Sequence, residues 1–357
     1  MTDDFVTRLG VALRDAADRE ERRRAPARAL AGAWATVPRL RPAPAIAAVV
    51  AAIVLLAALY ATISFKSDDP APAGPRVVAR VAPAGALDMI VPAFGSAWLV
   101  DTNSQTLLRM DPATRRVTAR IALNAPAVIA AGKGAIWVGV TRDTDFRLLR
   151  IDPRTNRITA RVRLPEKVGR SDFGGPLMVD GNLWVVGPEA ATRIDPASGR
   201  PTAAVSTAPT GYRTASLAVA GGDLWVQASD GRLLRLDGAT GRREATFHVP
   251  DGSFIGDFGM NGLFLVDHAS LARLDPRNLH ALWRTTLPSI GPGTAAGGRL
   301  WVEAPGSSGD RILTVDPRNG QVLDSVDVGE FGAQWMAPVG AEVWMSTAGG
   351  HVVILGR

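Results

Sequence analysis

The chain of 357 residues contains no cysteine, only four histidines and two tyrosines, and three lysines against 37 arginines. Without cysteine it can form no disulfide bond, no thiolate nucleophile and no metal site with sulfur ligands. The sequence also lacks the Gly-x-Ser-x-Gly elbow, the phosphate-binding loop and the His-Glu-x-x-His motif. These absences exclude the corresponding enzyme classes. The compartment stays open, because an exported protein can also lack disulfides.

Charged residues are absent from one long stretch, residues 42–65, which lies between Arg41 and Lys66. As a helix these 24 residues would extend roughly 36 Å, and the hydrocarbon core of a bilayer is about 30 Å thick. A buried core helix would show an amphipathic face, and none is visible here. A cleavable signal peptide would have shorter basic and apolar regions. The sequence therefore predicts an uncleaved transmembrane helix at residues 43–65, with the lipid bilayer as its partner.

The charges on either side of this helix predict its orientation. Arginines gather on the N-terminal side, from Arg22 to Arg41, whereas Lys66 on the other side is followed by Asp68 and Asp69. Positively charged flanks stay in the cytoplasm. We therefore expect a single-pass protein of the cell membrane with a cytoplasmic N-terminus and an extracytoplasmic C-terminal part.

The segments that flank the predicted helix differ in composition. Residues 1–42 form an Arg-rich tail, in which Leu9 and Leu13 fall on the apolar face of an amphipathic helix. The simpler interpretation is a solvated helix that its arginines hold near anionic lipid. The alternative is that residues 1–30 bind a cytoplasmic partner. Residues 66–76 are rich in proline and predict an extended linker.

Residues 77–357 repeat a pattern in which a turn is followed by an aromatic residue between aliphatic ones, as in GSAWLV, GAIWVG and GRLWVE. The aromatic positions are Trp98, Trp137, Trp184, Trp225, Phe264, Trp301 and Trp344, at spacings of 37 to 47 residues. A large side chain at the same place in every unit predicts a structural role, in which it packs between neighbouring units.

A second motif follows each aromatic residue except the last after 11 to 15 residues, as in RIDPRTNRI and TVDPRNGQV. Its aspartates are Asp111, Asp152, Asp195, Asp237, Asp275 and Asp316. Each predicts a turn, because the carboxylate can accept a backbone hydrogen bond from two residues on, and the proline that usually follows presets φ. We expect Asn156, Gly199, Gly241 or Gly320 to take the left-handed conformation that closes the hairpin.

Four strand-like stretches in each unit of about forty residues predict the blade of a β-propeller. Seven aromatic repeats over residues 77–357 predict an all-β, seven-bladed β-propeller of four-stranded antiparallel blades. The last unit is one strand short, and residues 76–82 resemble the missing strand, so we expect them to complete the seventh blade and close the ring. A single transmembrane helix and a short cytoplasmic helix would precede the propeller.

The repeat resembles those of YVTN-type and streptogramin (virginiamycin B) lyase-type propellers over residues 77–357, with units such as residues 95–123. This resemblance implies a seven-bladed ring, and such repeats occur in binding modules, surface proteins and lyases alike. The lyases use a histidine base and a carboxylate-held magnesium on the upper face, which would make His268 and Asp267 the catalytic candidates. The chain has no second histidine beside His268 and no His-x-Glu pair.

Residues 274–284, with Trp283 after the turn, resemble a unit of the quinoprotein propellers. Those proteins repeat the unit around the ring, whereas here one copy has it. The sequence therefore predicts no cofactor. It predicts no metal site either, because the pair Asp143 and Asp145 supplies too few ligands for a hard cation.

In a propeller, the loops between blades and the loops between the second and third strands share one face around the central tunnel. Ligands usually bind there. The candidate ligand-binding residues on this upper face are Arg142, Asp145, Arg170, Asp172, Tyr212, Arg213, Asp251, Phe254, Glu330 and Trp335. Among them, Tyr212 and Trp335 stand out as aromatic residues outside the repeated position.

Arginines recur beside the Asp turns, which spreads positive charge around the ring instead of focusing it. These arginines are Arg109, Arg150, Arg193, Arg235 and Arg273. Because the ring is also predicted to lie outside the cell, we expect no nucleic-acid partner. The sequence favours a membrane-tethered extracytoplasmic platform that binds an envelope protein or a small ligand and is coupled to a cytoplasmic partner. The alternative is a tethered lyase or hydrolase with its site on the upper face.

Overall fold

The computed structural model describes residues 74–123, 127–142, 145–164, 176–187, 190–207, 214–287, 290–304, 306 and 308–357. The chain divides into two compact units, Met1–Pro70 and Ala71–Arg357, and the described residues belong to the second. The predicted cytoplasmic helix, the predicted transmembrane helix at 43–65 and the linker up to residue 73 lie outside them. Within the described ranges, no helix is both long and apolar enough to cross a membrane.

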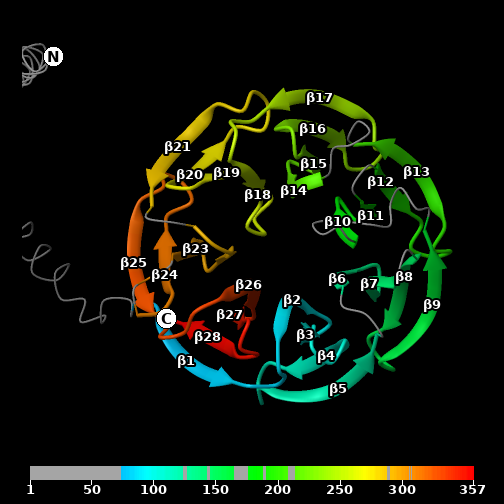
Figure 1. The fold of residues 1–357 in the computed structure, drawn as a ribbon, viewed down its shortest axis with the longest axis horizontal. Helices are drawn as coiled ribbons and strands as arrows, with labels where there is room; N and C mark the ends of the chain where they lie inside the picture. Colours follow the sequence, from blue (N-terminus) through cyan, green and yellow to red (C-terminus); the bar gives the residue numbers. More distant parts are fainter. Residues whose placement is uncertain are drawn as a thin grey trace, which may run out of the picture. The chain divides into compact units, whose positions relative to one another are not determined.

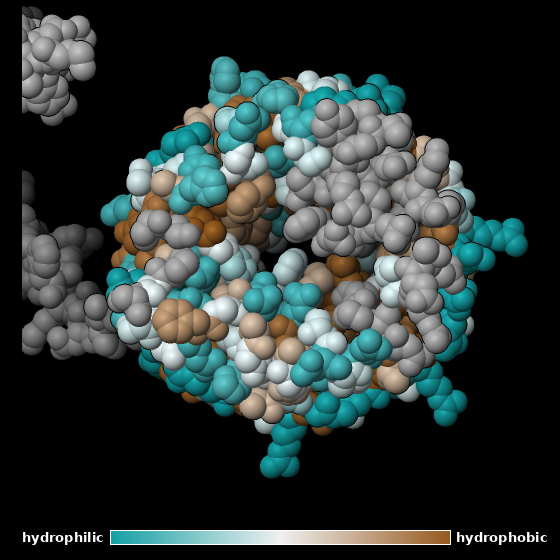
Figure 2. Space-filling view, in the orientation of Figure 1, coloured by the Kyte–Doolittle hydropathy of each residue, from teal (hydrophilic) through white to brown (hydrophobic). Residues whose placement is uncertain are grey.

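The described residues form seven four-stranded antiparallel sheets arranged as a ring (Figure 1). Figure 2 shows one face of this ring in space-filling form, with a hollow at its centre. The predicted all-β, seven-bladed propeller is therefore confirmed. In blades 1 to 6 the order of strands in the sheet follows the chain, from the innermost strand to the rim.

The strands of the first three blades have the following bounds. Blade 1 consists of β2 (Leu87–Ala93), β3 (Ser96–Asp101), β4 (Thr106–Asp111) and β5 (Arg116–Ala122). Blade 2 consists of β6 (Ala127–Gly132), β7 (Ala135–Arg142), β8 (Asp145–Asp152) and β9 (Arg157–Arg163). Blade 3 consists of β10 (Pro176–Val179), β11 (Asn182–Val186), β12 (Ala190–Ile194) and β13 (Pro201–Ser206).

Blades 4 to 6 repeat this order. Blade 4 consists of β14 (Thr214–Ala220), β15 (Asp223–Ala228), β16 (Arg232–Asp237) and β17 (Arg243–His248). Blade 5 consists of β18 (Phe254–Gly256), β19 (Leu263–Asp267), β20 (Ser270–Leu274) and β21 (Ala281–Thr286). Blade 6 consists of β22 (Gly293–Ala296), β23 (Arg299–Ala304), β24 (Arg311–Val315) and β25 (Val322–Asp327).

The seventh blade joins the two ends of the propeller. It consists of β26 (Ala333–Val339), β27 (Glu342–Thr347), β28 (Val352–Gly356) and β1 (Arg76–Val81). Strand β1 pairs antiparallel with β28, from Arg76 opposite Gly356 to Val81 opposite Val352. The N-terminal strand thus supplies the outer strand that the last repeat lacks. It also covers the edge of β28, which would otherwise be free to pair with another chain.

The repeated aromatic residues lie between the blades, in the role that their spacing predicts. Trp98 of β3 is fully buried and packs in one cluster with Ile136 of the next blade. Trp301 packs in the same way with Met345 of β27. Because each blade packs against two others, the second strands β3 and β15 are buried along their whole length. The outer strand β9 alternates between exposed and half-buried residues.

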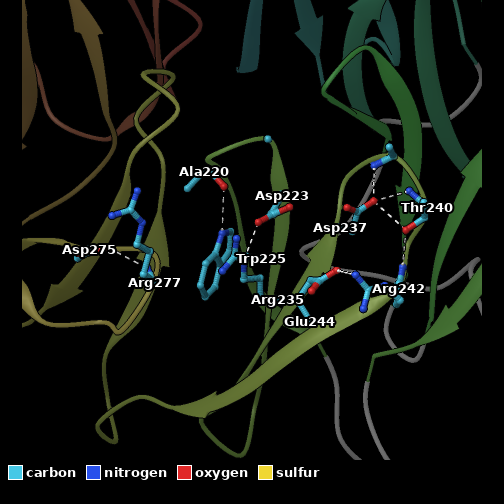
Figure 3. Close-up of polar contacts among 12 residues, drawn as sticks. Ala220, Asp223, Trp225, Arg235, Asp237, Thr240, Arg242, Glu244, Asp275 and Arg277 are labelled. Carbon is cyan, nitrogen blue, oxygen red and sulfur yellow. Dashed lines mark hydrogen bonds and ion pairs between the residues drawn. The ribbon is translucent and has the colours of Figure 1, made fainter.

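The Asp turns also form as predicted. The carboxylate of Asp237 accepts hydrogen bonds from the hydroxyl (2.8 Å) and backbone N–H (2.7 Å) of Thr240 and from the backbone N–H of Ala239 (3.1 Å) (Figure 3). These donors stabilise the charged carboxylate and lower the pKa of Asp237. Gly241 follows with a φ of 78°. Asn156, Gly199 and Gly320 have positive φ at the same place in their turns, as do Arg115 and Leu279.

Three of the repeated arginines, Arg109, Arg193 and Arg273, make hydrogen bonds between blades. Arg109 stands opposite Trp98 in the sheet and lies over its ring, 5.2 Å from the centroid. Its Nη1 donates a hydrogen bond of 2.6 Å to the backbone oxygen of Pro153 in the next blade. Arg273 makes the corresponding bond of 2.9 Å to Pro317. These three arginines therefore join neighbouring blades, whereas Arg150 and Arg235 bond to Thr159 and Asp223 of their own blades.

The junction between blades 7 and 1 uses a different contact. Opposite Trp344 stands Ile354, so the arginine is missing at this position of the repeat. Instead, Arg115 in the Asp turn of blade 1 pairs with Glu342 at 2.9 Å. The other oxygen of Glu342 accepts a hydrogen bond of 3.0 Å from the indole of Trp344. Between blades 7 and 1, the Glu342 carboxylate therefore replaces the hydrogen bond that Arg109 and Arg273 donate to a backbone carbonyl of the next blade.

Candidate ligand-binding site

The inner strands enclose a central cavity of about 1100 Å³. Its described walls come from β2, β6, β10, β14, β18 and β26, which lie around the ring axis in Figure 1. Most of the wall is apolar, with side chains such as Met89, Ile129, Leu177 and Leu217, and brown, hydrophobic residues border the hollow in Figure 2. Cavities of this size with few polar groups are the usual sites for small ligands.

Three carboxylates belong to the cavity lining, those of Asp88, Asp251 and Asp257. Burial raises the pKa of Asp257, although its carboxylate accepts backbone hydrogen bonds from Val219 (2.9 Å) and Gly259 (2.8 Å). Burial also raises the pKa of Asp88, to whose carboxylate no described residue donates a hydrogen bond. None of the described lining residues is lysine, arginine or histidine. The described cavity wall is therefore acidic, while the whole chain has a net charge of +6.

Three residues that the sequence singled out for ligand binding lie at this cavity, namely Asp251, Phe254 and Trp335. The first two come from the start of blade 5, and Trp335 comes from β26 of blade 7. Phe254 is 46% exposed and Trp335 is 39% exposed, whereas the repeated Trp98 is fully buried. Two aromatic surfaces therefore stay accessible in the cavity wall.

Gln227 of β15 is a polar residue of the cavity wall that was not among the candidates predicted from the sequence. Its amide nitrogen donates a hydrogen bond of 2.8 Å to the backbone oxygen of Ser253. Its Oε1 accepts hydrogen bonds from the hydroxyl of Ser216 (2.7 Å) and the backbone N–H of Ile255 (3.0 Å). These bonds join blades 4 and 5 at the cavity. A signal is present in the sequence, because Gln227 stands two residues after Trp225, where four of the seven repeats have valine or glycine.

The same position of blade 6 holds a buried acid, Glu303, which is 5% exposed. Burial and the neighbouring Asp310 raise the pKa of Glu303 to about 7. The Asp310 carboxylate accepts a hydrogen bond of 3.0 Å from the backbone N–H of Ala333, at the start of β26. Two buried acidic groups thus lie at the junction of blades 6 and 7, outside the described cavity lining.

The two catalytic candidates, Asp267 and His268, do not act on one another. The Asp267 carboxylate accepts hydrogen bonds from the hydroxyl of Ser270 (2.6 Å) and the backbone N–H of Ala269 (2.9 Å), and it pairs with Arg284 at 3.1 Å. These contacts hold the turn and lower the pKa of Asp267. His268 is exposed next to this turn. A histidine base needs a group that orients it, and Asp267 is bonded to other partners.

Glu330, a further candidate, has partners that serve ring closure. Its carboxylate pairs with Arg80 of β1 at 3.1 Å and with Nδ1 of His351 at 2.9 Å. Arg80 also donates a hydrogen bond of 2.5 Å to the backbone oxygen of Val328. Glu330 thus connects the N-terminal strand to the loop between blades 6 and 7, and it is not among the described lining residues of the cavity.

The remaining candidates have no described side chains. Arg170, Asp172, Tyr212 and Arg213 lie outside the described residues, and for Arg142 and Asp145 only the backbone is described, at the end of the β7–β8 hairpin. Across the part of the chain that the structure describes, no three His, Cys, Asp or Glu side chains are grouped so that they could hold a metal ion.

No family model matches the chain, and a search of curated proteins finds no match. The resemblance to YVTN-type and streptogramin lyase-type propellers therefore stays a prediction from the repeat. Among solved structures, 1366 chains match. One is the crystal structure of BamB from Moraxella catarrhalis, with a TM-score of 0.55 and 11% identity over 79% of this chain and 100% of that chain. At this identity the likeness shows the fold alone, a β-propeller similar in structure to BamB.

Proposed function

We propose that this chain is a membrane-anchored binding protein whose propeller takes its ligand, or a protruding part of a partner protein, at the central cavity. The cavity itself carries the proposal. It is large and mainly apolar, it has accessible aromatic side chains in Phe254 and Trp335, and it is bordered by carboxylates. The contacts of Asp267 and His268 support binding over catalysis, because neither group positions the other for acid–base chemistry.

The location is part of the same proposal. The uncharged stretch 43–65 anchors the chain in the cell membrane, and the arginines between Arg22 and Arg41 keep the N-terminus in the cytoplasm. The propeller is then extracytoplasmic. The tail of residues 1–30 is available to a cytoplasmic partner, which would receive the signal of ligand binding.

Site-specific photo-crosslinking in living cells tests the binding site. A benzophenone amino acid is placed at Trp335 or Phe254 in the cavity wall, and as a control at Leu282, which is 58% exposed on the outer strand β21. We expect an adduct, detected by mass spectrometry, from positions 335 and 254 and none from position 282. Adducts from all three positions, or from none, would overturn the proposed site.

The orientation is tested separately. A reporter that is active only outside the cytoplasm is fused after Arg357, and a second reporter that is active only inside is fused in its place. We expect activity from the first fusion and none from the second. The reverse result would place the propeller in the cytoplasm and overturn the proposed location, without bearing on the cavity.

A further inference from the structure

The central cavity has a charge pattern that differs from the rest of the ring. Elsewhere in the ring, several acidic side chains pair with arginine, as Asp223 does with Arg235 at 2.5 Å (Figure 3). In the cavity, the carboxylates of Asp88, Asp251 and Asp257 have no basic partner among the described residues. Although the whole chain has 40 basic and 34 acidic residues, the described part of the cavity lining contains acidic residues and no basic ones.

These carboxylates lie in unfavourable surroundings. Asp88 and Asp257 are held in a wall of apolar side chains, where removal of water raises the pKa of both groups. Asp257 receives backbone hydrogen bonds, yet these neutral donors do not cancel its charge. A positive charge placed beside either carboxylate would be attracted more strongly than in bulk water, because the surrounding protein screens the interaction less.

The uncharged part of the wall indicates what else the ligand carries. The lining includes Met89, Leu177 and Leu217, which favour contact with hydrocarbon. The rings of Phe254 and Trp335 are partly exposed, and an aromatic ring can contact a cation with its face as well as an apolar group. A bare metal ion fits less well, since the described residues bring no three ligands together and the wall is mainly apolar.

We propose that the cavity binds an organic cation, a molecule with an amine or quaternary ammonium group on an apolar body. The carboxylates of the lining, Asp88 and Asp257 among them, attract the positive charge, and the apolar side chains of the inner strands contact the body. This inference rests on the proposed function and names the class of ligand. An anionic or purely hydrocarbon ligand of equal size binds more weakly, because it leaves the carboxylates unpaired.

Two probes that share a benzyl group and carry opposite charges test this proposal, benzylammonium and benzylsulfonate. Their binding to the full-length protein in detergent is measured by isothermal titration calorimetry. We expect the cation to bind with one site per chain and the anion to bind at least tenfold more weakly. We expect Asp88→Asn and Asp257→Asn each to weaken the cation at least fivefold. Asp324→Asn is the control, because this exposed carboxylate lies on the outer strand β25 and is not part of the described lining.

Asp257→Asn removes an acceptor for the Val219 and Gly259 N–H groups and could impair folding. Asp88→Asn keeps the test decisive, because no described donor depends on that carboxylate. Equal binding of both probes, binding of neither, or an unchanged affinity of Asp88→Asn would overturn the proposal. Adducts at position 335 together with no preference for the cation would leave the proposed function standing and remove only this inference. Cation binding without adducts in cells would leave the cation-binding cavity standing and overturn the proposed function.

Discussion

Arg109 and Pro153 belong to different blades, and the guanidinium of Arg109 donates a hydrogen bond of 2.6 Å to the backbone oxygen of Pro153. The same side chain lies over Trp98 and donates a hydrogen bond of 2.9 Å from its Nε to the hydroxyl of Ser96. One residue therefore covers the buried aromatic of its own blade and reaches the Asp turn of the next. The repeat thus carries a contact between blades as well as the core of each blade.

Replacing Arg109 by alanine should loosen the junction of blades 1 and 2. The change removes the bond to Pro153 and the cover of Trp98, which together are worth about 1–2 kcal/mol of the free energy of unfolding. Urea denaturation of the full-length protein measures this value. Arg116→Ala is the matched control, since it removes an exposed arginine with no described contact, and it should change the free energy by less than about 0.5 kcal/mol. Equal losses in the two variants would contradict a specific role of Arg109.

Glu330→Ala should act on ring closure and leave ligand binding unchanged. The variant removes the ion pairs with Arg80 and His351, and we expect it to lower Tm by about 2–4 °C. Arg80→Ala should produce a similar loss, and the double variant should lose less than the sum, because both changes break the same contact. Photo-crosslinking from position 335 should keep its yield in all three variants. A lost adduct with an unchanged Tm would instead assign Glu330 to the ligand site.

Glu303 should make the stability of the propeller depend on pH near neutrality. Its folded-state pKa of about 7 lies above the unfolded value of 4.5, so the folded state binds a proton more tightly. The contribution of Glu303 to the free energy of unfolding is therefore fully present below about pH 4.5 and is lost as pH rises to about 7. We expect this loss to be about 1–2 kcal/mol after allowance for solvent screening. Denaturation at pH 5.5 and pH 8 measures the difference. Glu303→Gln, which keeps the shape without the charge, should reduce it, and an unchanged difference would contradict this assignment.

Asp316 should contribute a dependence of the opposite sign. Hydrogen bonds from the Arg318 guanidinium, 3.0 Å and 2.7 Å long, lower the pKa of Asp316 from 3.8 to about 2. The stability that it contributes is present above pH 3.8 and is lost as pH falls towards 2. Asp316→Asn should flatten the stability curve between these values and leave the curve above pH 5 parallel to that of the natural chain. A steeper loss in the variant would contradict the role of the ion pair.

Much of the candidate site is formed by residues that lie far apart in the sequence, so no local sequence pattern predicts that they come together. Phe254 and Trp335 could be singled out because they are aromatic residues outside the repeated position in segments predicted to be loops; the structure places them on β18 and β26, and the cavity lining includes both. Asp88 and Asp257 could not, because an acidic residue near a short strand has no signature until the inner strands enclose a cavity. Glu330 and Arg80 meet across 250 residues of sequence, so the partner of Glu330 follows from ring closure alone.

The sequence by itself determined the number of blades, the place of the buried aromatic residues and the Asp turns. These features repeat in every unit and rest on interactions within one blade or with the next, so a period of about forty residues is enough to predict them. The tertiary structure alone decided which side chains line the cavity and which carboxylates keep an arginine. Those properties arise when inner strands from six blades come together around one axis, where carboxylates from distant parts of the sequence are buried in one described wall that has no lysine, arginine or histidine.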